Sequence, residues 1–138
     1  MDTLTVKNIR AYGYTGYFPE EQVLGQWFSV DLTFRLNLAT AGDTDELPDT
    51  LDYSQAVSLV QNLIQSTKVK TIERLITIVA DRLLQETIAE EVTARLTKCQ
   101  PPIPDFFIDW AIDRFSSNLA AALVVSKILI SYCLFLRY

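Results

Sequence analysis

The chain of 138 residues contains no histidine. This absence excludes Ser-His-Asp and Cys-His catalytic arrangements, and also the His-rich sites in which catalytic zinc is usually held. Proton transfer in this protein must therefore use Lys, Tyr, Glu, Asp, Cys or water. The sequence also lacks a P-loop and a dinucleotide-binding glycine pattern, and it gives no sign of a metal or cofactor site.

Cysteine and positive charge are scarce as well. The two cysteines, Cys99 and Cys133, form no disulfide framework, and nothing at the N-terminus resembles a signal peptide, so we expect a cytoplasmic protein. Twelve Lys and Arg residues stand against 17 Asp and Glu residues, which gives a net charge of −5. This balance argues against a nucleic-acid partner, which would require a basic stripe.

The spacing of apolar residues predicts four strands and two helices in one main domain. The expected strands are one from Leu4 that bends near Gly13, one over Trp27–Leu38, one over Val92–Lys98 and a short one over Ile108–Ile112. One helix is capped by Asp52, and a second is opened by Lys70 or Thr71. The connections are a loop at Pro19–Glu21 and an acidic, turn-rich segment over Thr40–Asp52. The order ββααββ indicates an α+β fold with two helices on one face of an antiparallel sheet.

Lys98 occupies a position where the pattern calls for an apolar side chain. Val92, Ala94 and Leu96 alternate with polar residues, and by parity Lys98 falls on their apolar face. A lysine drawn toward a core loses hydration and becomes a candidate base. The structural alternative is a lysine at the end of a strand that extends its charged group to water.

The C-terminal residues 116–138 differ in kind from residues 1–115, which we expect to form the functional domain. Leu119 to Leu136 is almost wholly apolar and is interrupted by Lys127. Three explanations remain open: a membrane span, in which Lys127 would be costly; an added packing helix; and an end that is not native to the domain.

Four segments together resemble the dihydroneopterin aldolase family: GYTGYFPEEQVLGQWFSVDL, DTLDYSQ, IERL at residues 72–75, and TKCQPPIP. The similarity extends from about Leu4 to about Phe106. It implies the tunnelling fold, assembled into tetrameric rings that often stack into octamers. It also implies the retro-aldol cleavage of 7,8-dihydroneopterin, a pterin of the folate pathway, without a metal or cofactor. The substrate's own C=N bond accepts the electrons, so the enzyme supplies proton transfer and orientation.

The resemblance assigns catalytic roles to three residues. Lys98 matches the lysine that takes the proton of the substrate's 2′-hydroxyl. Tyr53 matches a tyrosine that helps to protonate the intermediate and reaches the lysine site of a neighbouring subunit. Glu21 matches a loop acid near the lysine and the substrate hydroxyls. Taken alone, Tyr53 would be a packing aromatic in a first helical turn, and Glu21 one more exposed glutamate.

The resemblance also assigns residues to the pterin ring. Glu73 matches the glutamate that binds the amino-pyrimidine edge through two parallel hydrogen bonds, and Ile72 and Leu51 offer backbone groups to the same ring. The structural alternative for Glu73 is a first-turn glutamate favoured by the helix dipole.

Two positions depart from the family pattern. Thr15 stands where the motif G-Y-H-G has histidine, so this position keeps a hydroxyl for hydrogen bonding and has no acid–base role. Asp105 stands where a glycine usually follows PPIP, so the stretch that leads into the last strand also departs from the family pattern.

Two alternative functions remain open from the sequence. One is a dihydroneopterin or dihydroneopterin-triphosphate epimerase; the acidic loops favour an uncharged substrate over a triphosphate. The other is a non-catalytic tunnelling-fold subunit or membrane-tethered binding protein. The presence of all four matched polar side chains, Lys98, Tyr53, Glu73 and Glu21, argues against it.

Overall fold

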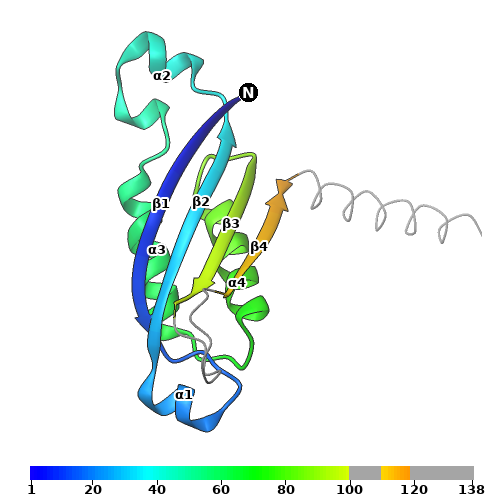
Figure 1. The fold of residues 1–138 in the computed structure, drawn as a ribbon. Coiled ribbons are helices and arrows are strands. Elements are labelled where there is room, and N and C mark those ends of the chain that lie inside the picture. Colours follow the sequence, from blue (N-terminus) through cyan, green and yellow to red (C-terminus); the bar gives the residue numbers. More distant parts are fainter. Residues whose placement is uncertain (100–109, 119–138) are drawn as a thin grey trace, which may run out of the picture.

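The computed structural model describes residues 1–99 and 110–118 of the chain. In this part the chain forms a four-stranded sheet of β1 (Asp2–Gly13), β2 (Gln26–Leu36), β3 (Glu91–Lys98) and β4 (Trp110–Ser117). The strands lie in the order β1-β2-β3-β4, and each pair of neighbours is antiparallel (Figure 1). β1 and β4 are therefore the edges of the sheet.

Two long helices, α3 (Tyr53–Ser66) and α4 (Ile72–Glu86), cover one face of this sheet (Figure 1). Each begins at a side chain that accepts a hydrogen bond from the first helical turn: Asp52 from the backbone N–H of Ser54, and Thr71 from that of Arg74. Both caps agree with the predicted helix starts. Shorter elements occupy the connections: α1 (Pro19–Leu24), α2 (Ala39–Thr44) and the 3₁₀-helix η1 (Leu47–Asp49).

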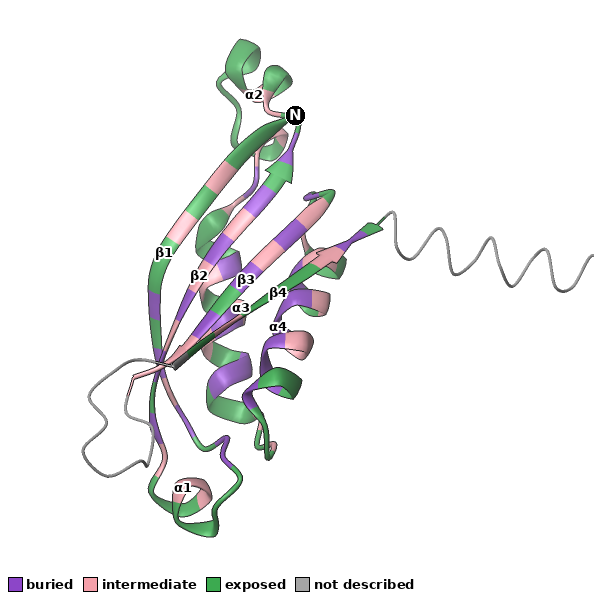
Figure 2. Ribbon diagram, turned by 45° about the vertical axis from the view of Figure 1, so that its right-hand side comes forward, coloured by how far each residue is buried: buried purple, intermediate pink, exposed green. Residues whose placement is uncertain are grey.

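The core lies between the helices and the sheet. Along β2 and β3 buried side chains alternate with more exposed ones, as the period of two requires (Figure 2). The largest fully buried side chains come from both layers: Phe28, Phe34, Leu32, Leu36, Ile64, Leu75, Ile76, Leu83, Leu96, Val30, Val60 and Val79. Each such side chain contributes roughly 1.5–3 kcal/mol to folding by leaving water.

The opposite face of the sheet carries polar side chains. Thr33 and Thr93 lie opposite each other on β2 and β3, and Arg95 of β3 pairs with Asp113 of β4 at 2.6 Å. The sequence predicted that helices cover only the apolar face of the sheet, and the structure agrees.

The predicted α+β fold with two helices on one face is confirmed, but two local predictions are wrong. Pro19–Glu21 belongs to helix α1 rather than to a loop. β4 continues to Ser117, beyond the predicted end at Ile112, because its pairing with β3 extends back to Glu91.

The predictions for Ile108 and for the apolar tail from Leu119 lie outside the described residues. Among the residues that are described, no helix has the length and apolar character needed to cross a membrane.

Candidate functional site

The candidate functional site begins at the end of the apolar face of β3. Val92, Ala94 and Leu96 are buried there, and Lys98 follows on the same face, as its parity predicts. Its side chain is only 13% exposed, and its Cα lies opposite that of the buried Phe28 in β2. The core face of the sheet therefore ends in a lysine that is largely removed from water.

Helix α1 supplies the partner of this lysine. Pro19 opens the helix at a position where its missing N–H costs nothing, and Glu21 stands two residues later in the first turn. From there the Glu21 carboxylate reaches back and accepts a hydrogen bond from the backbone N–H of Phe18 at 3.2 Å. This short helix therefore fixes the direction of the Glu21 side chain.

Gly16 makes room for the glutamate. A Cβ atom at this position would lie 2.4 Å from the Cβ of Glu21, which is closer than carbon atoms can approach. The glycine is thus required for Glu21 to fold back against its own loop.

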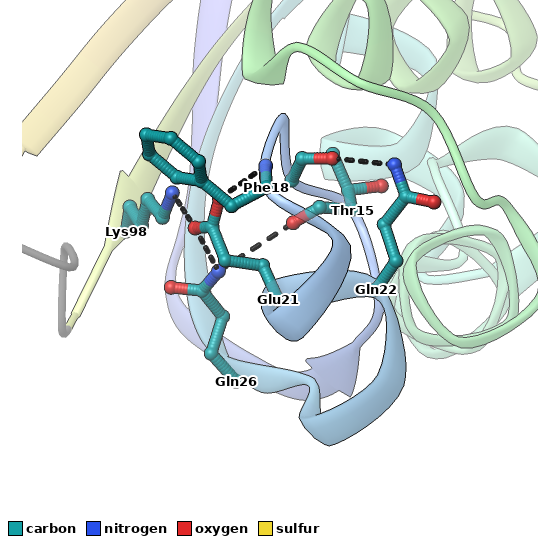
Figure 3. Close-up of polar contacts among 7 residues, drawn as sticks. Thr15, Phe18, Glu21, Gln22, Gln26 and Lys98 are labelled. Atoms are coloured by element: carbon teal, nitrogen blue, oxygen red, sulfur yellow. Dashed lines mark hydrogen bonds and ion pairs between the residues drawn. The ribbon is translucent and has the colours of Figure 1, made fainter.

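Glu21 and Lys98 form an ion pair in which Nζ donates to Oε1 (Figure 3). The Glu21 side chain is 9% exposed. Burial raises the pKa of Glu21, but the hydrogen bonds from Lys98, from the Phe18 N–H and from Gln26, together with the positive charge of Lys98, outweigh this effect and hold the pKa below its ordinary value of 4.5. The carboxylate is therefore ionised at neutral pH.

Gln26 is a polar residue of the site that the sequence analysis did not single out. Its side-chain amide donates to Glu21 Oε1 at 3.1 Å and lies 3.5 Å from the backbone oxygen of Thr15 (Figure 3). Its own Oε1 atom is buried and has no hydrogen-bond partner among the described residues. The signal was present, since Gln26 shares the parity of Phe28 and Val30, as Lys98 shares that of Leu96.

Glu73 and Ile72 lie at the same end of the sheet as the ion pair. The backbone N–H of Gly16 donates to the oxygen of Val69 at 3.0 Å, so the Glu21 loop contacts the segment that leads into α4. Ile72 opens α4 and is buried in the core, whereas Glu73 is exposed in the first turn. The structure thus brings four of the six predicted site residues to one end of the sheet: Lys98, Glu21, Glu73 and Ile72.

Tyr53 and Leu51 lie toward the other end. Helix α3 reaches the Gly13 end of β1 through Ile64, and Tyr53 precedes Ile64 by about three turns, or roughly 16 Å along the helix. Tyr53 is 60% exposed, and the buried Leu51 lines a cavity of about 340 Å³ with residues such as Thr87. Within one chain these two residues do not join Lys98.

The donor groups of the site suit proton transfer more than metal binding. An amine, a carboxylate and an amide meet in a largely buried position, where electrostatic interactions are strong. In the described part of the chain, no group of three or more His, Cys, Asp or Glu side chains is arranged to hold a metal ion.

The fold and the site together define an α+β protein with a lysine–glutamate pair at the end of its sheet. The family model for dihydroneopterin aldolase matches residues 4–113. A Synechocystis protein described as a probable dihydroneopterin aldolase is 58% identical over 118 residues, which are 86% of this chain and 100% of the relative. The dihydroneopterin aldolase of Bacillus subtilis is 36% identical over 82% of this chain and 95% of its own length. This chain belongs to the dihydroneopterin aldolase family.

A solved structure has the same fold. The crystal structure of Escherichia coli dihydroneopterin aldolase in complex with neopterin superposes with a TM-score of 0.74 at 21% identity, covering 83% of this chain and 99% of that one. The similarity therefore extends over nearly the whole of that enzyme.

Proposed function

We propose that this protein is an aldolase that cleaves 7,8-dihydroneopterin into 6-hydroxymethyl-7,8-dihydropterin and glycolaldehyde for folate biosynthesis. The observation that carries the proposal is the Glu21–Lys98 pair at the end of the sheet, whose side chains are only 9% and 13% exposed, in a chain that belongs to this family. A desolvated amine and carboxylate in contact are suited to moving a proton to and from a substrate hydroxyl.

The reaction needs a base at the 2′-hydroxyl of the substrate side chain. When this hydroxyl loses its proton, the C1′–C2′ bond breaks, C2′ becomes the aldehyde carbon of glycolaldehyde, and the electron pair moves into the C=N bond of the dihydropterin ring. A proton then returns to C1′ to give the hydroxymethyl product. No Schiff base to the protein is needed, because the ring itself accepts the electrons.

Lys98 is the group that we propose takes up the 2′-hydroxyl proton, directly or through water, which requires that its amine be neutral when the proton is transferred. In the structure its Nζ donates a hydrogen bond to Glu21. The hydroxyls of an entering substrate would therefore compete with Nζ for the carboxylate. Gln26 would keep Glu21 oriented during this exchange, since it donates to the same Oε1 atom. The pair would thus hold and release the proton at one fixed place.

The pterin ring would bind at the start of α4. Glu73 is exposed there, and its carboxylate can accept two parallel N–H bonds from the amino-pyrimidine edge. Ile72 would offer backbone groups to the same ring, since its side chain is held in the core. Ring binding and proton transfer are therefore assigned to different elements at one end of the sheet.

Tyr53 and Leu51 would enter the site from a neighbouring subunit. Both lie toward the other end of their own chain, and the exposed phenol of Tyr53 is available to a second copy. We propose a homo-oligomer, a tetramer or octamer, in which Tyr53 of one subunit helps to protonate the intermediate beside Lys98 of the next. The cytoplasm, where the two cysteines stay reduced, is the proposed compartment.

The test is product analysis with purified protein and 7,8-dihydroneopterin, with and without EDTA. We expect both products to form at the same rate in the two conditions, because the mechanism uses no metal. Loss of activity with EDTA that zinc restores would contradict the metal-free mechanism. Formation of the 2′-epimer without glycolaldehyde would instead favour the epimerase, and no turnover with retained pterin binding would favour a binding subunit.

A further inference from the structure

We infer that Thr15 is a positioning residue that fixes the Glu21 loop against the segment leading into α4, and so sets where the acid–base pair stands relative to a bound pterin. The inference rests on the proposed function. It assigns a role to a side chain that differs from the histidine of the family motif and that cannot itself transfer protons at neutral pH.

The Thr15 side chain is fully buried and makes two polar contacts. Its hydroxyl donates to the backbone oxygen of Thr67 at 3.1 Å and lies 3.5 Å from the backbone N–H of Val69, from which it accepts. A hydroxyl can perform both roles at once because it has one donor and two acceptor positions. One side chain thus joins two loops that are far apart in the sequence.

The same residue is linked to the ion pair. The backbone oxygen of Thr15 lies 3.5 Å from the amide nitrogen of Gln26, and that nitrogen also donates to Glu21 at 3.1 Å (Figure 3). The backbone N–H of the next residue, Gly16, donates to the backbone oxygen of Val69. Because Gly16 has no side chain, it also leaves the space that Glu21 fills. Thr15 therefore lies between the glutamate and the α4 segment.

Apolar packing gives this loop little support of its own. Its neighbours Tyr14, Tyr17 and Phe18 are exposed, so Thr15 is the buried side chain that anchors it. The start of α4, by contrast, is held independently by the buried Ile72 and by the cap from Thr71. Loss of the Thr15 hydroxyl should consequently move the Glu21 loop and leave the proposed ring-binding position in place.

The test compares Thr15→Val, which keeps the shape and removes the hydroxyl, with Thr15→Ser, which keeps the hydroxyl. For each full-length protein we would measure kcat with 7,8-dihydroneopterin and the Kd of 6-hydroxymethyl-7,8-dihydropterin, per folded protein as judged by circular dichroism. We expect the valine variant to lose about tenfold to a hundredfold in kcat, since small misplacements of reacting groups have effects of this order. The Kd of the valine variant should stay within about threefold of the wild type, because ring binding is assigned to the start of α4. Both kcat and Kd of the serine variant should also stay within about threefold, because serine keeps the hydroxyl.

Four results would overturn the inference. Equal kcat in the valine variant and the wild type would remove the role of the hydroxyl, and equal losses in both variants would assign the effect to side-chain volume. If the valine variant does not fold, Thr15→Ala replaces it, and failure of both to fold beside an active serine variant would make Thr15 purely structural. Absence of cleavage by the wild type itself would overturn the proposed function, and this inference with it.

Discussion

Lys98 and Glu21 depend on each other because both are largely removed from water. Nζ donates to Oε1, which also accepts from the side-chain amide of Gln26, and the remaining carboxylate oxygen accepts from the Phe18 N–H. Removal of one partner from such a pair leaves an uncompensated charge in a desolvated position. Substitutions here are therefore informative about both chemistry and stability.

Replacement of Lys98 by alanine should remove most turnover while pterin binding is retained. General acid–base catalysis contributes roughly a hundredfold to ten-thousandfold, whereas the ring is assigned to Glu73 and backbone groups. The measurement is kcat together with the Kd of 6-hydroxymethyl-7,8-dihydropterin. Glu73→Ala should behave oppositely and lose ligand affinity first.

Lys7→Ala is the matched control for this experiment, since Lys7 is an exposed lysine on an edge strand. It should leave both constants unchanged. A Lys98→Ala protein that keeps more than about half of the wild-type rate would assign Lys98 to the structural role of a lysine at a strand end.

The lowered pKa of Glu21 predicts a pH-dependent contribution to stability. A carboxyl group whose pKa is lower in the folded protein than the ordinary 4.5 stabilises the fold above that value and loses the contribution as the pH falls through the folded pKa. The advantage of the wild type over Glu21→Gln in free energy of unfolding should therefore be constant from pH 7 to 5 and shrink below pH 4.5. Urea titrations at one protein concentration measure this difference.

Glu20→Gln is the control, because Glu20 is the exposed neighbour in the same helix. A difference between wild type and Glu21→Gln that stays the same down to pH 3 would show that the ion pair does not lower the pKa.

At the scale of elements, the loop from Gly13 to Gly16 and helix α1 act as one unit. The helix directs Glu21 back toward its own N-terminus, and the glycine supplies the space that the side chain needs. The position of the carboxylate is thus a property of the two elements together rather than of the residue.

Gly16→Ala should consequently impair catalysis although Gly16 contributes no functional group. The added methyl would lie 2.4 Å from the Cβ of Glu21 and force the side chain away from Lys98. We expect kcat to fall at least about tenfold, since positioning errors of this kind have large effects. Steady-state kinetics on the folded variant measure it.

Gly42→Ala is the matched control, because the added carbon would meet no heavy atom within 4 Å beyond its chain neighbours and its own helix backbone. Gly42 lies in α2, where alanine should stabilise the helix by about 0.5–1 kcal/mol. Normal activity in both variants would mean that the loop adjusts without moving the glutamate.

At the scale of the whole molecule, the sheet leaves edges at β1 and β4 and an uncovered polar face. Exposed edges favour pairing with further strands, and closing such sheets into a ring would bury them. The separation of Tyr53 from Lys98 within one chain also leads us to expect an oligomer, because only a second copy could bring the two side chains together.

Inactive proteins carrying Lys98→Ala and Tyr53→Phe should therefore restore partial activity when they are mixed after dissociation. Some interfaces of the mixed oligomer regain both side chains, whereas each parent lacks one everywhere. The assay is the rate of glycolaldehyde release before and after mixing. A monomer by light scattering at micromolar concentration would contradict the shared site.

Removal of residues 119–138 should leave catalysis unchanged and improve solubility. We propose a cut after Asn118 because β4 extends past residue 115: Ser117 is buried, and the N–H of Asn118 donates to the oxygen of Glu90 at 3.1 Å. So apolar a segment favours aggregation or adsorption when exposed. Specific activity and sedimentation of the truncated protein measure the effect, and loss of folding or of the oligomer would make the tail part of the domain.

The sequence alone predicted the layers of this fold, because periodicity reports which side of an element meets the core. The apolar parity of β2 and β3, the helix starts at Asp52 and Thr71, and the anomalous position of Lys98 were all local patterns. The helix α1 was missed although Pro19 and Glu21 stood at positions typical of a first turn.

Only the tertiary structure decided which side chains meet. Lys98 and Glu21 lie in segments far apart in the sequence, and their contact depends on the pairing of β3 with β2, on α1 and on the space at Gly16. The partners of Gln26 and Thr15, and the separation of Tyr53 from Lys98, likewise follow from strand register and helix direction. A sequence records the period of each element, but the distance between two elements is fixed by how they pack.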